Sequence, residues 1–214
     1  MSPAFFVGPA EAFAARGYAA VVIMRRGFGH SNGPYAEDSS GECNNRDYLR
    51  IGWISAEDVL GAAVALRAEP WAAPDRVVLL GQSTGGLAVT AAAATNPPGV
   101  VGILNFAGGR GSDAPDHVCS DDRLVEAFGT FGQTARIPAL WVFSKNDHFF
   151  GPALARRMFE AYTAGGAPAQ LEMLPPVGTD GHTALELAPR ELIWGPVDAF
   201  LASLNLPTQL VIGR

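Results

Sequence analysis

The sequence predicts an α/β fold, in which a mostly parallel sheet is covered by helices on both faces. Short runs rich in β-branched and other apolar residues alternate along the chain with Ala-rich, amphipathic segments. Such alternation is typical of parallel sheets, because two parallel strands must be joined by a crossover long enough for a helix. A second observation is that residues 77–109 carry no charge, as expected for a strand, helix and second strand buried in one core.

Five buried strands are expected from the apolar runs. The first run, residues 18–24, reads Tyr-Ala-Ala-Val-Val-Ile-Met and is bounded by a glycine and by a pair of arginines. The later runs have the same character, each bounded by Gly, Pro or charge. They cover residues 76–80, 100–105, 139–143 and 170–174.

Helices are expected between these strands, and the whole chain is expected to form one domain. At about 150 residues per domain, 214 residues fit a single domain over 1–214, with residues 112–135 as an insertion that carries one helix. That insertion is either a small lid or a surface excursion. The other helices are expected over residues 9–16, 55–67, 85–95, 151–164 and 190–204.

Charge and hydropathy exclude several kinds of partner. The net charge is −6, and no basic cluster is longer than two residues, which argues against nucleic acid or an anionic membrane surface as partner. The uncharged run 77–109 is long enough to span a bilayer, but Gln82 and Pro97-Pro98 interrupt it as a turn and a loop would. The amino terminus has neither a basic start nor a clear cleavage site, so no signal peptide is expected.

The two cysteines, Cys43 and Cys119, are too few and too far apart for a zinc site. Both lie in polar, loop-like segments, whereas free cysteines more often lie in apolar strands or helices. We therefore expect a disulfide, with two free thiols as the alternative. A disulfide favours a secreted or periplasmic protein, and free thiols favour a cytoplasmic one.

The strongest functional signal follows the strand expected at 76–80. Its residues are Gly81, Gln82, Ser83, Thr84, Gly85 and Gly86. The pattern G-x-S-x-G between a strand and a helix is typical of a nucleophile elbow, where Ser83 lies on a strained turn and the flanking glycines leave room for the chain to reverse. The alternative is a chance match, because G-x-S-x-G is common in Gly-rich chains.

A serine nucleophile needs a base to take its proton and a carboxylate to orient that base. Asp147 follows the strand expected at 139–143, at the strand end where ligand sites of open α/β sheets lie. His182 follows the last expected strand. The order Ser83, Asp147, His182 is the order of a nucleophile-elbow hydrolase.

The rival side chains are few. His148 adjoins the proposed acid, His30 follows the first expected strand and His117 lies in the insertion, and each is interpreted as an ordinary loop residue. Asp180 competes with Asp147, but two residues before His182 it is better placed to cap the loop. Phe149, Phe150 and Trp141 could line an acyl pocket, although aromatics beside a sheet are more often core.

Four motifs together resemble those of the α/β-hydrolases, in the dienelactone-hydrolase-like and prolyl-peptidase-like branches. They are R-R-G-F-G-H-S after the first expected strand, the G-Q-S-T-G-G elbow, N-D-H-F-F at the acid and D-G-H at the base. The resemblance implies the triad Ser83, Asp147 and His182, with the backbone N–H of Thr84 as one oxyanion donor. Dienelactone hydrolases use Cys as nucleophile, so Ser83 points to esters in general.

The chain departs from this family at its amino terminus. In the family, two or three strands and a His-Gly loop with the second oxyanion donor precede the helix that is expected here at 9–16. One of those strands lies between the strands expected at 18–24 and 76–80, so its absence should leave an unpaired edge or force these two together. We expect either a truncated form of a longer protein or a reduced version of that segment in residues 1–7. Losing one oxyanion donor costs about 2.7 to 4 kcal/mol of transition-state stabilisation.

The sequence thus predicts a serine hydrolase of small-molecule carboxylic esters that needs no metal or cofactor. Two alternatives stay open. One is an amidase or peptidase of the prolyl-peptidase kind, and the other is a non-catalytic binding protein with the same fold. The oligomeric state is not predicted.

Overall fold

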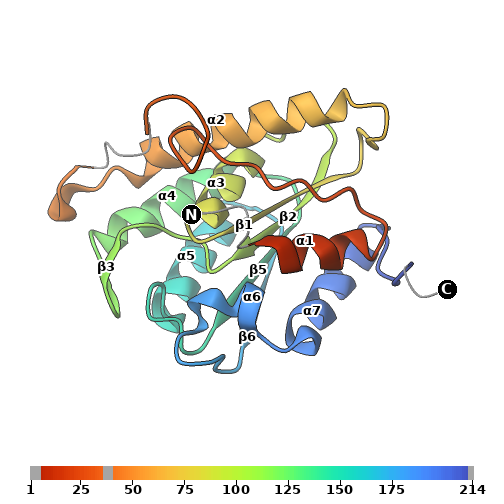
Figure 1. Ribbon diagram of the computed structural model, residues 1–214. Helices are drawn as coiled ribbons and strands as arrows, with labels where there is room; N and C mark the ends of the chain where they lie inside the picture. The colour runs from red at the N-terminus through yellow and green to blue at the C-terminus, as the bar shows by residue number, and fades with distance from the viewer. Residues whose placement is uncertain (1–5, 36–40, 212–214) are drawn as a thin grey trace.

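The computed structural model describes residues 6–35 and 41–211, and at its centre is a parallel four-stranded sheet (Figure 1). The strand order is β1-β2-β5-β6, and each neighbouring pair runs parallel. The strands are β1 (Val77–Gln82), β2 (Val100–Phe106), β5 (Ala139–Ser144) and β6 (Ala169–Leu174). This arrangement confirms the α/β fold and four of the five expected strands.

Helices cover both faces of the sheet, each over its own apolar core. On one face of the sheet, side chains such as Ile103 and Trp141 pack against four helices. On the other face, Leu104 and Val142 pack against the remaining three. The first group is α2 (Tyr48–Arg67), α3 (Thr84–Ala93), α4 (Asp121–Thr134) and α5 (Pro152–Ala164). The second group is α1 (Val7–Ala14), α6 (Ala184–Leu187) and α7 (Arg190–Ser203). Alternate residues of a strand point to opposite faces, so both cores depend on the same four strands.

Helix α2 begins at Tyr48, seven residues before the expected start at 55. The carboxylate of Asp47 accepts a hydrogen bond from the backbone N–H of Arg50 at 3.0 Å and so caps the first turn. Tyr48 and Ile51 are fully buried against the core. The expected start was too late because this cap and the buried first turn were not recognised.

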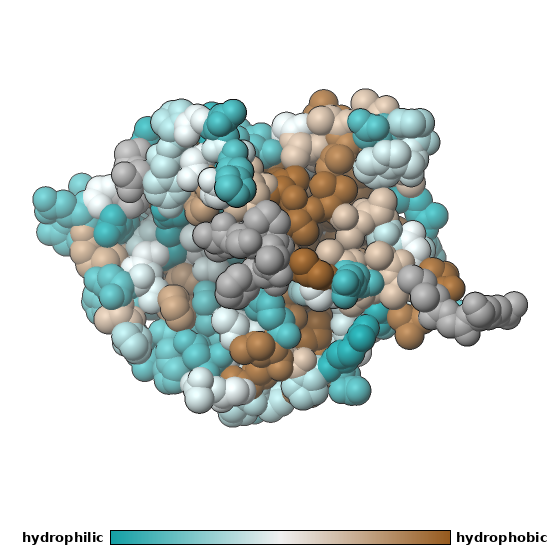
Figure 2. All heavy atoms as spheres, in the orientation of Figure 1, coloured by the Kyte–Doolittle hydropathy of each residue, from teal (hydrophilic) through white to brown (hydrophobic). Residues whose placement is uncertain are grey.

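The prediction of a strand at residues 18–24 was wrong. The segment pairs with no strand, and β1 lies at the edge of the described sheet. A groove of about 490 Å³ separates the two and is lined by both of them. Val21, which lines this groove, is 49% exposed. On the face of the molecule seen in Figure 2, hydrophobic residues gather in a hollow. Within residues 6–35 and 41–211 the edge of the sheet at β1 is therefore unpaired, as expected, and residues 18–24 stay unpaired because the groove keeps β1 from their backbone.

The insertion at 112–135 contains the expected helix, α4, and a small hairpin that was not predicted. The hairpin pairs β3 (Ser112–Ala114) with β4 (His117–Val118) in antiparallel fashion. Strands of two and three residues are too short to show an alternating pattern, so nothing in the sequence marked them. Of the amino-terminal segment 1–7 considered above, residues 1–5 lie outside the described part.

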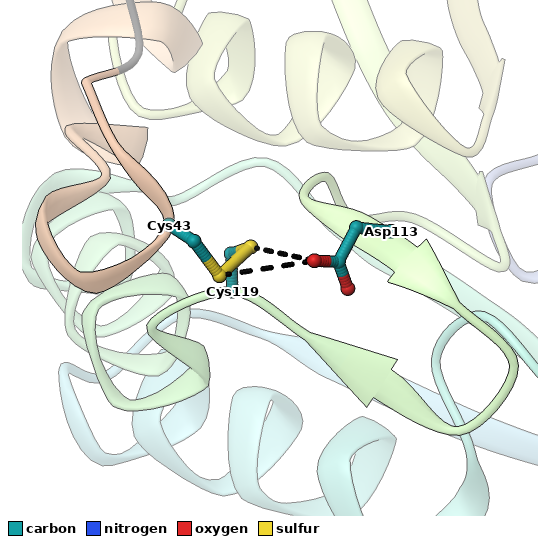
Figure 3. Close-up of side chains that lie close together, drawn as sticks. All are labelled: Cys43, Asp113 and Cys119. Carbon is teal, nitrogen blue, oxygen red and sulfur yellow. Dashed lines mark hydrogen bonds between the residues drawn. A yellow bond between two sulfur atoms is a disulfide. The ribbon is translucent and has the colours of Figure 1, made fainter.

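Cys43 and Cys119 form a disulfide, as expected. It joins the short 3₁₀ turn Cys43–Asn45, which precedes α2, to the residue after β4. Figure 3 shows the Asp113 carboxylate facing the bridge, with its Oδ2 3.3 Å from Cys119 Sγ and 3.8 Å from Cys43 Sγ. Two sulfurs bonded to each other are not thiolates, so these three side chains do not form a metal site in this state. The disulfide is compatible with a secreted or periplasmic protein.

Of the helices formed by residues 6–35 and 41–211, none is long and apolar enough to cross a membrane.

We predict that the disulfide contributes substantially to stability. The two cysteines are 76 residues apart, and closing so long a loop removes entropy from the unfolded chain. Replacing both with serine should lower the free energy of unfolding by about 2 to 4 kcal/mol, measured by urea denaturation. Dithiothreitol should have the same effect on the wild type and none on the double variant. Equal midpoints for wild type and variant, or two titratable thiols in the unreduced denatured protein, would contradict the bridge.

Candidate active site

Ser83 lies on the sharp turn between β1 and α3. Its backbone has φ 54° and ψ −121°, which is unfavourable for a residue with a side chain. Glycine neighbours make the turn possible, since a Cβ at Gly81 would lie 2.0 Å from the carbonyl oxygen of Gly85. The Ser83 N–H donates to the Phe106 carbonyl at 3.0 Å, which ties the turn to the end of β2. This is the geometry expected of a nucleophile elbow.

Asp147 and His182 are brought together although 35 residues separate them. Asp147 lies in the loop after β5, and His182 lies in the 3₁₀ turn Gly181–Thr183 after β6. The His182 Nδ1 is 3.3 Å from the Asp147 Oδ2, and both side chains are buried. A carboxylate at Nδ1 leaves Nε2 free to act as a base.

Backbone hydrogen bonds hold the Asp147 carboxylate in place. Its Oδ1 accepts from the N–H groups of Phe149 at 2.7 Å and Phe150 at 2.9 Å, so Oδ2 is left to face the imidazole. Asp147 is 1% exposed, so water does not compete for the hydrogen bonds of its carboxylate. The carboxylate therefore has one orientation.

Asp180 acts as a cap within the loop. Its Oδ1 accepts from the backbone N–H of His182 at 2.9 Å and of His148 at 3.2 Å. These contacts fix the backbone of the histidine loop, whereas the contact to the imidazole is made by Asp147. The geometry thus follows the expectation that Asp180 shapes the turn.

The side chains of the other histidines make their contacts outside this pair; His30 and His117 are exposed, and His148, which follows Asp147, is half-buried. His148 contacts the Asp116 carboxylate at 3.0 Å, and this hydrogen bond raises the pKa of His148. His117 contacts Asp113 in the same way and thereby lowers the pKa of that carboxyl group. His30 is exposed in the loop after the unpaired segment. Asp116 thus joins the hairpin to the acid loop, a link the sequence did not reveal.

Thr84 is the first residue of α3, so its N–H has no partner within the helix and lies at the positive end of the helix dipole. This is the position of the expected oxyanion donor. The Thr84 hydroxyl accepts from Arg25 Nη2 at 3.1 Å. In the part of the chain that the structure describes, no hydrogen bond joins Ser83 Oγ to His182.

Two of the three aromatic residues considered for a pocket adjoin the candidate base. The Phe149 ring stacks on His182 with centroids 4.1 Å apart and is 41% exposed, and Phe150 meets the imidazole edge-on at 5.5 Å. Trp141 is instead buried in the core beside Phe128. Of these three aromatic residues, Phe149 is the one whose side chain is exposed.

The Gln82 side chain makes a contact that could not be predicted from the sequence. Its Nε2 donates to the His182 carbonyl at 2.9 Å and to Glu186 Oε2 at 3.3 Å. Burial raises the pKa of Glu186, and the bond from Gln82 partly offsets that shift. A contact across 100 residues has no signature in a single sequence.

Three solved structures share this fold at low sequence identity. A protein described as a dienelactone hydrolase from Klebsiella pneumoniae subsp. pneumoniae MGH 78578 is 17% identical, with a TM-score of 0.52 over 70% of this chain and 61% of that one. A puromycin-hydrolyzing peptidase from Mycobacterium tuberculosis is 18% identical, with a TM-score of 0.54 over 75% and 27%. A lipase-esterase related protein from Clostridium acetobutylicum ATCC 824 is 13% identical, with a TM-score of 0.60 over 89% of each chain.

These matches show the α/β-hydrolase fold, and the chain spans less than two thirds of the first two structures. No curated protein matches the sequence. A family model, that of the X-Pro dipeptidyl-peptidase (S15 family), matches residues 4–174. Since this match covers most of the 214 residues, the chain belongs to the X-Pro dipeptidyl-peptidase (S15) family of hydrolases with the α/β-hydrolase fold.

Proposed function

We propose that this protein is a serine hydrolase that cleaves small-molecule carboxylic esters through an acyl-enzyme. Ser83 is the nucleophile, His182 the general base and acid, and Asp147 the carboxylate that orients His182. The observation that carries the proposal is the buried contact of 3.3 Å between His182 and Asp147, in a protein that also holds a serine in elbow geometry. That combination is what nucleophilic catalysis by a serine requires, and it supports the proposal.

The proposed reaction has two steps. His182 Nε2 takes the Ser83 proton as Oγ attacks the acyl carbon, and the same proton then passes to the departing alcohol oxygen as the ester bond breaks. Water, deprotonated by His182, next attacks the acyl-enzyme and releases the acid, and Ser83 recovers its proton. Asp147 stabilises the imidazolium in both steps without accepting its proton.

The Thr84 N–H supports the proposal as the donor to the developing oxyanion. Esters are favoured over amides on chemical grounds. An alcohol is a better leaving group than an amine, so ester cleavage makes smaller demands on oxyanion stabilisation and on protonation by His182.

Peptide hydrolysis is the second candidate, and family membership is the observation that favours it. The family is described as X-Pro dipeptidyl-peptidase, and one structural neighbour is a puromycin-hydrolyzing peptidase. The same triad could cleave an amide, provided that His182 protonates the amine before it leaves. Substrate comparison therefore separates the two candidates.

The Cys43–Cys119 disulfide supports a location outside the cytosol, in the periplasm or the medium, because structural disulfides form in oxidising compartments.

We predict that Ser83 is the reactive serine. A fluorophosphonate probe should modify the wild type at Ser83, as mapped by mass spectrometry of the digested adduct, and should not modify Ser83→Ala. Ser144→Ala is the matched control, because this serine is buried at the end of β5 and hydrogen-bonded to Asn146. Labelling at another serine would overturn the assignment, and absence of labelling in the wild type would favour a non-catalytic binding protein.

We predict faster turnover of esters than of peptides. The wild type should release p-nitrophenol from p-nitrophenyl butyrate with a higher kcat/KM than it releases p-nitroaniline from an Ala-Pro-p-nitroanilide. Ser83→Ala should abolish both activities. A higher kcat/KM for the anilide would assign the protein to peptide hydrolysis.

We predict that Asp147 and Asp180 differ sharply in their contribution to catalysis. Asp147→Asn removes the carboxylate that holds the imidazole and should lower kcat by about 10³- to 10⁴-fold, measured with p-nitrophenyl butyrate. Asp180→Asn keeps an oxygen that can accept from the two backbone N–H groups and should lower kcat by less than about tenfold. The reverse order would transfer the orienting role to Asp180.

A further inference from the structure

The Gln82 side chain is a direct link between the turn that carries Ser83 and the turn that carries His182. Gln82 is the last residue of β1, immediately before Ser83. Its amide N–H group donates to the backbone carbonyl of His182 at 2.9 Å. Because side chains alternate along a strand, Gln82 leaves β1 on the face where Phe106 and α6 pack.

The other hydrogen bonds of the His182 turn come from the acid loop and from the turn itself. Asp147 contacts the imidazole, Asp180 accepts from the His182 N–H, and the Gly181 N–H donates to the Asn146 carbonyl at 3.0 Å. These contacts fix His182 relative to Asp147, and none of them fixes it relative to Ser83. Within the described residues, the Gln82 bond is the hydrogen bond that joins β1 to this turn.

Glu186 accepts the second hydrogen bond from the same amide nitrogen. Its Oε2 accepts from Gln82 Nε2 at 3.3 Å. A primary amide has two N–H donors on its nitrogen and one acceptor oxygen. Because the His182 carbonyl and the Glu186 carboxylate both accept from the nitrogen, the NH₂ group of Gln82, and not its oxygen, faces His182. The other carboxyl oxygen of Glu186 is buried without a hydrogen-bond partner among the described residues. Gln82 is therefore a side-chain contact that offsets part of the cost of partly burying Glu186.

We propose that Gln82 is a positioning residue that sets the distance between Ser83 and His182, and that Glu186 orients its amide. The inference rests on the proposed function, because it assigns Gln82 to the same serine and histidine. Gln82 does not touch the reacting atoms. It acts through the His182 backbone, and small errors in the placement of a catalytic group are costly, about 100-fold for roughly 1 Å.

The test replaces Gln82 with methionine, which keeps the length of the side chain and removes both donors. For p-nitrophenyl butyrate hydrolysis by Gln82→Met, kcat should fall about 10- to 100-fold while KM stays within about twofold. The rate of fluorophosphonate labelling at Ser83 should fall in proportion to kcat. The matched control is Gln133→Met, whose side chain is exposed on α4, and it should behave as the wild type.

Two Glu186 variants separate orientation of the amide from general packing. Glu186→Gln keeps an oxygen that accepts from Gln82 and should retain kcat within about twofold. Glu186→Met removes the acceptor but leaves the bond to His182 possible, so kcat should fall by an intermediate amount, about three- to tenfold. If Gln82→Met does not fold, these two variants decide the question, because equal kcat values for them would overturn the role of Glu186 and of the amide orientation that it fixes.

A spectroscopic measurement does not depend on turnover. The downfield proton resonance of the His182 Nδ1–H bonded to Asp147 should persist in Gln82→Met, because that pair is held by the acid loop, while kcat falls. Wild-type kcat and labelling in Gln82→Met would overturn the proposal, as would a lost resonance, which would make Gln82 a support of the whole histidine loop. Absence of labelling and of ester turnover in the wild type would instead refute the proposed function.

Discussion

The backbone of Ser83 is the constraint on which the site depends. A residue with a side chain at φ 54° and ψ −121° costs of order 1–3 kcal/mol, and it persists only where its surroundings leave no alternative. Here β1 is fixed by pairing with β2, and α3 packs so closely behind the turn that a Cβ at Gly86 would lie 2.3 Å from Asn105 Oδ1. Strand, turn and helix are thus one rigid unit. Its geometry places the Ser83 side chain at the carboxyl end of the sheet.

The parallel sheet then brings the other groups to the same end. Because β1, β2, β5 and β6 run in one direction, the loops that follow them all leave the sheet at one edge. The acid loop after β5 and the histidine turn after β6 meet there, and backbone donors hold the Asp147 carboxylate. Strand pairing therefore brings these loops to one end of the sheet. This explains how three candidate residues spread over 100 positions come to lie after strands that end at one edge of the sheet.

The features predicted correctly are those that depend on residues close together in the sequence. Four strands were predicted correctly because each is a short apolar run with clear boundaries. The elbow was predicted from G-x-S-x-G between a strand and a helix, and Asp147 was chosen as the candidate acid because it follows such a strand. The same reasoning wrongly made residues 18–24 a strand, since composition shows what a segment can pair with but not whether a partner lies beside it. Helix α2 was started too late because its capping by Asp47 was overlooked. The Gln82–Glu186 contact could not be predicted, because it depends on the packing of α6 under β1.

The groove beside β1 has a consequence for how the protein behaves in a crowded solution. Half of the backbone N–H and C=O groups of an edge strand point away from its neighbour, and here they border a hollow lined with apolar side chains. Such an edge is a template for any extended chain that reaches it, including the unfolded form of the same protein. Pairing between two chains at such an edge would be a bimolecular step, whereas folding is unimolecular, so the balance between them would depend on protein concentration.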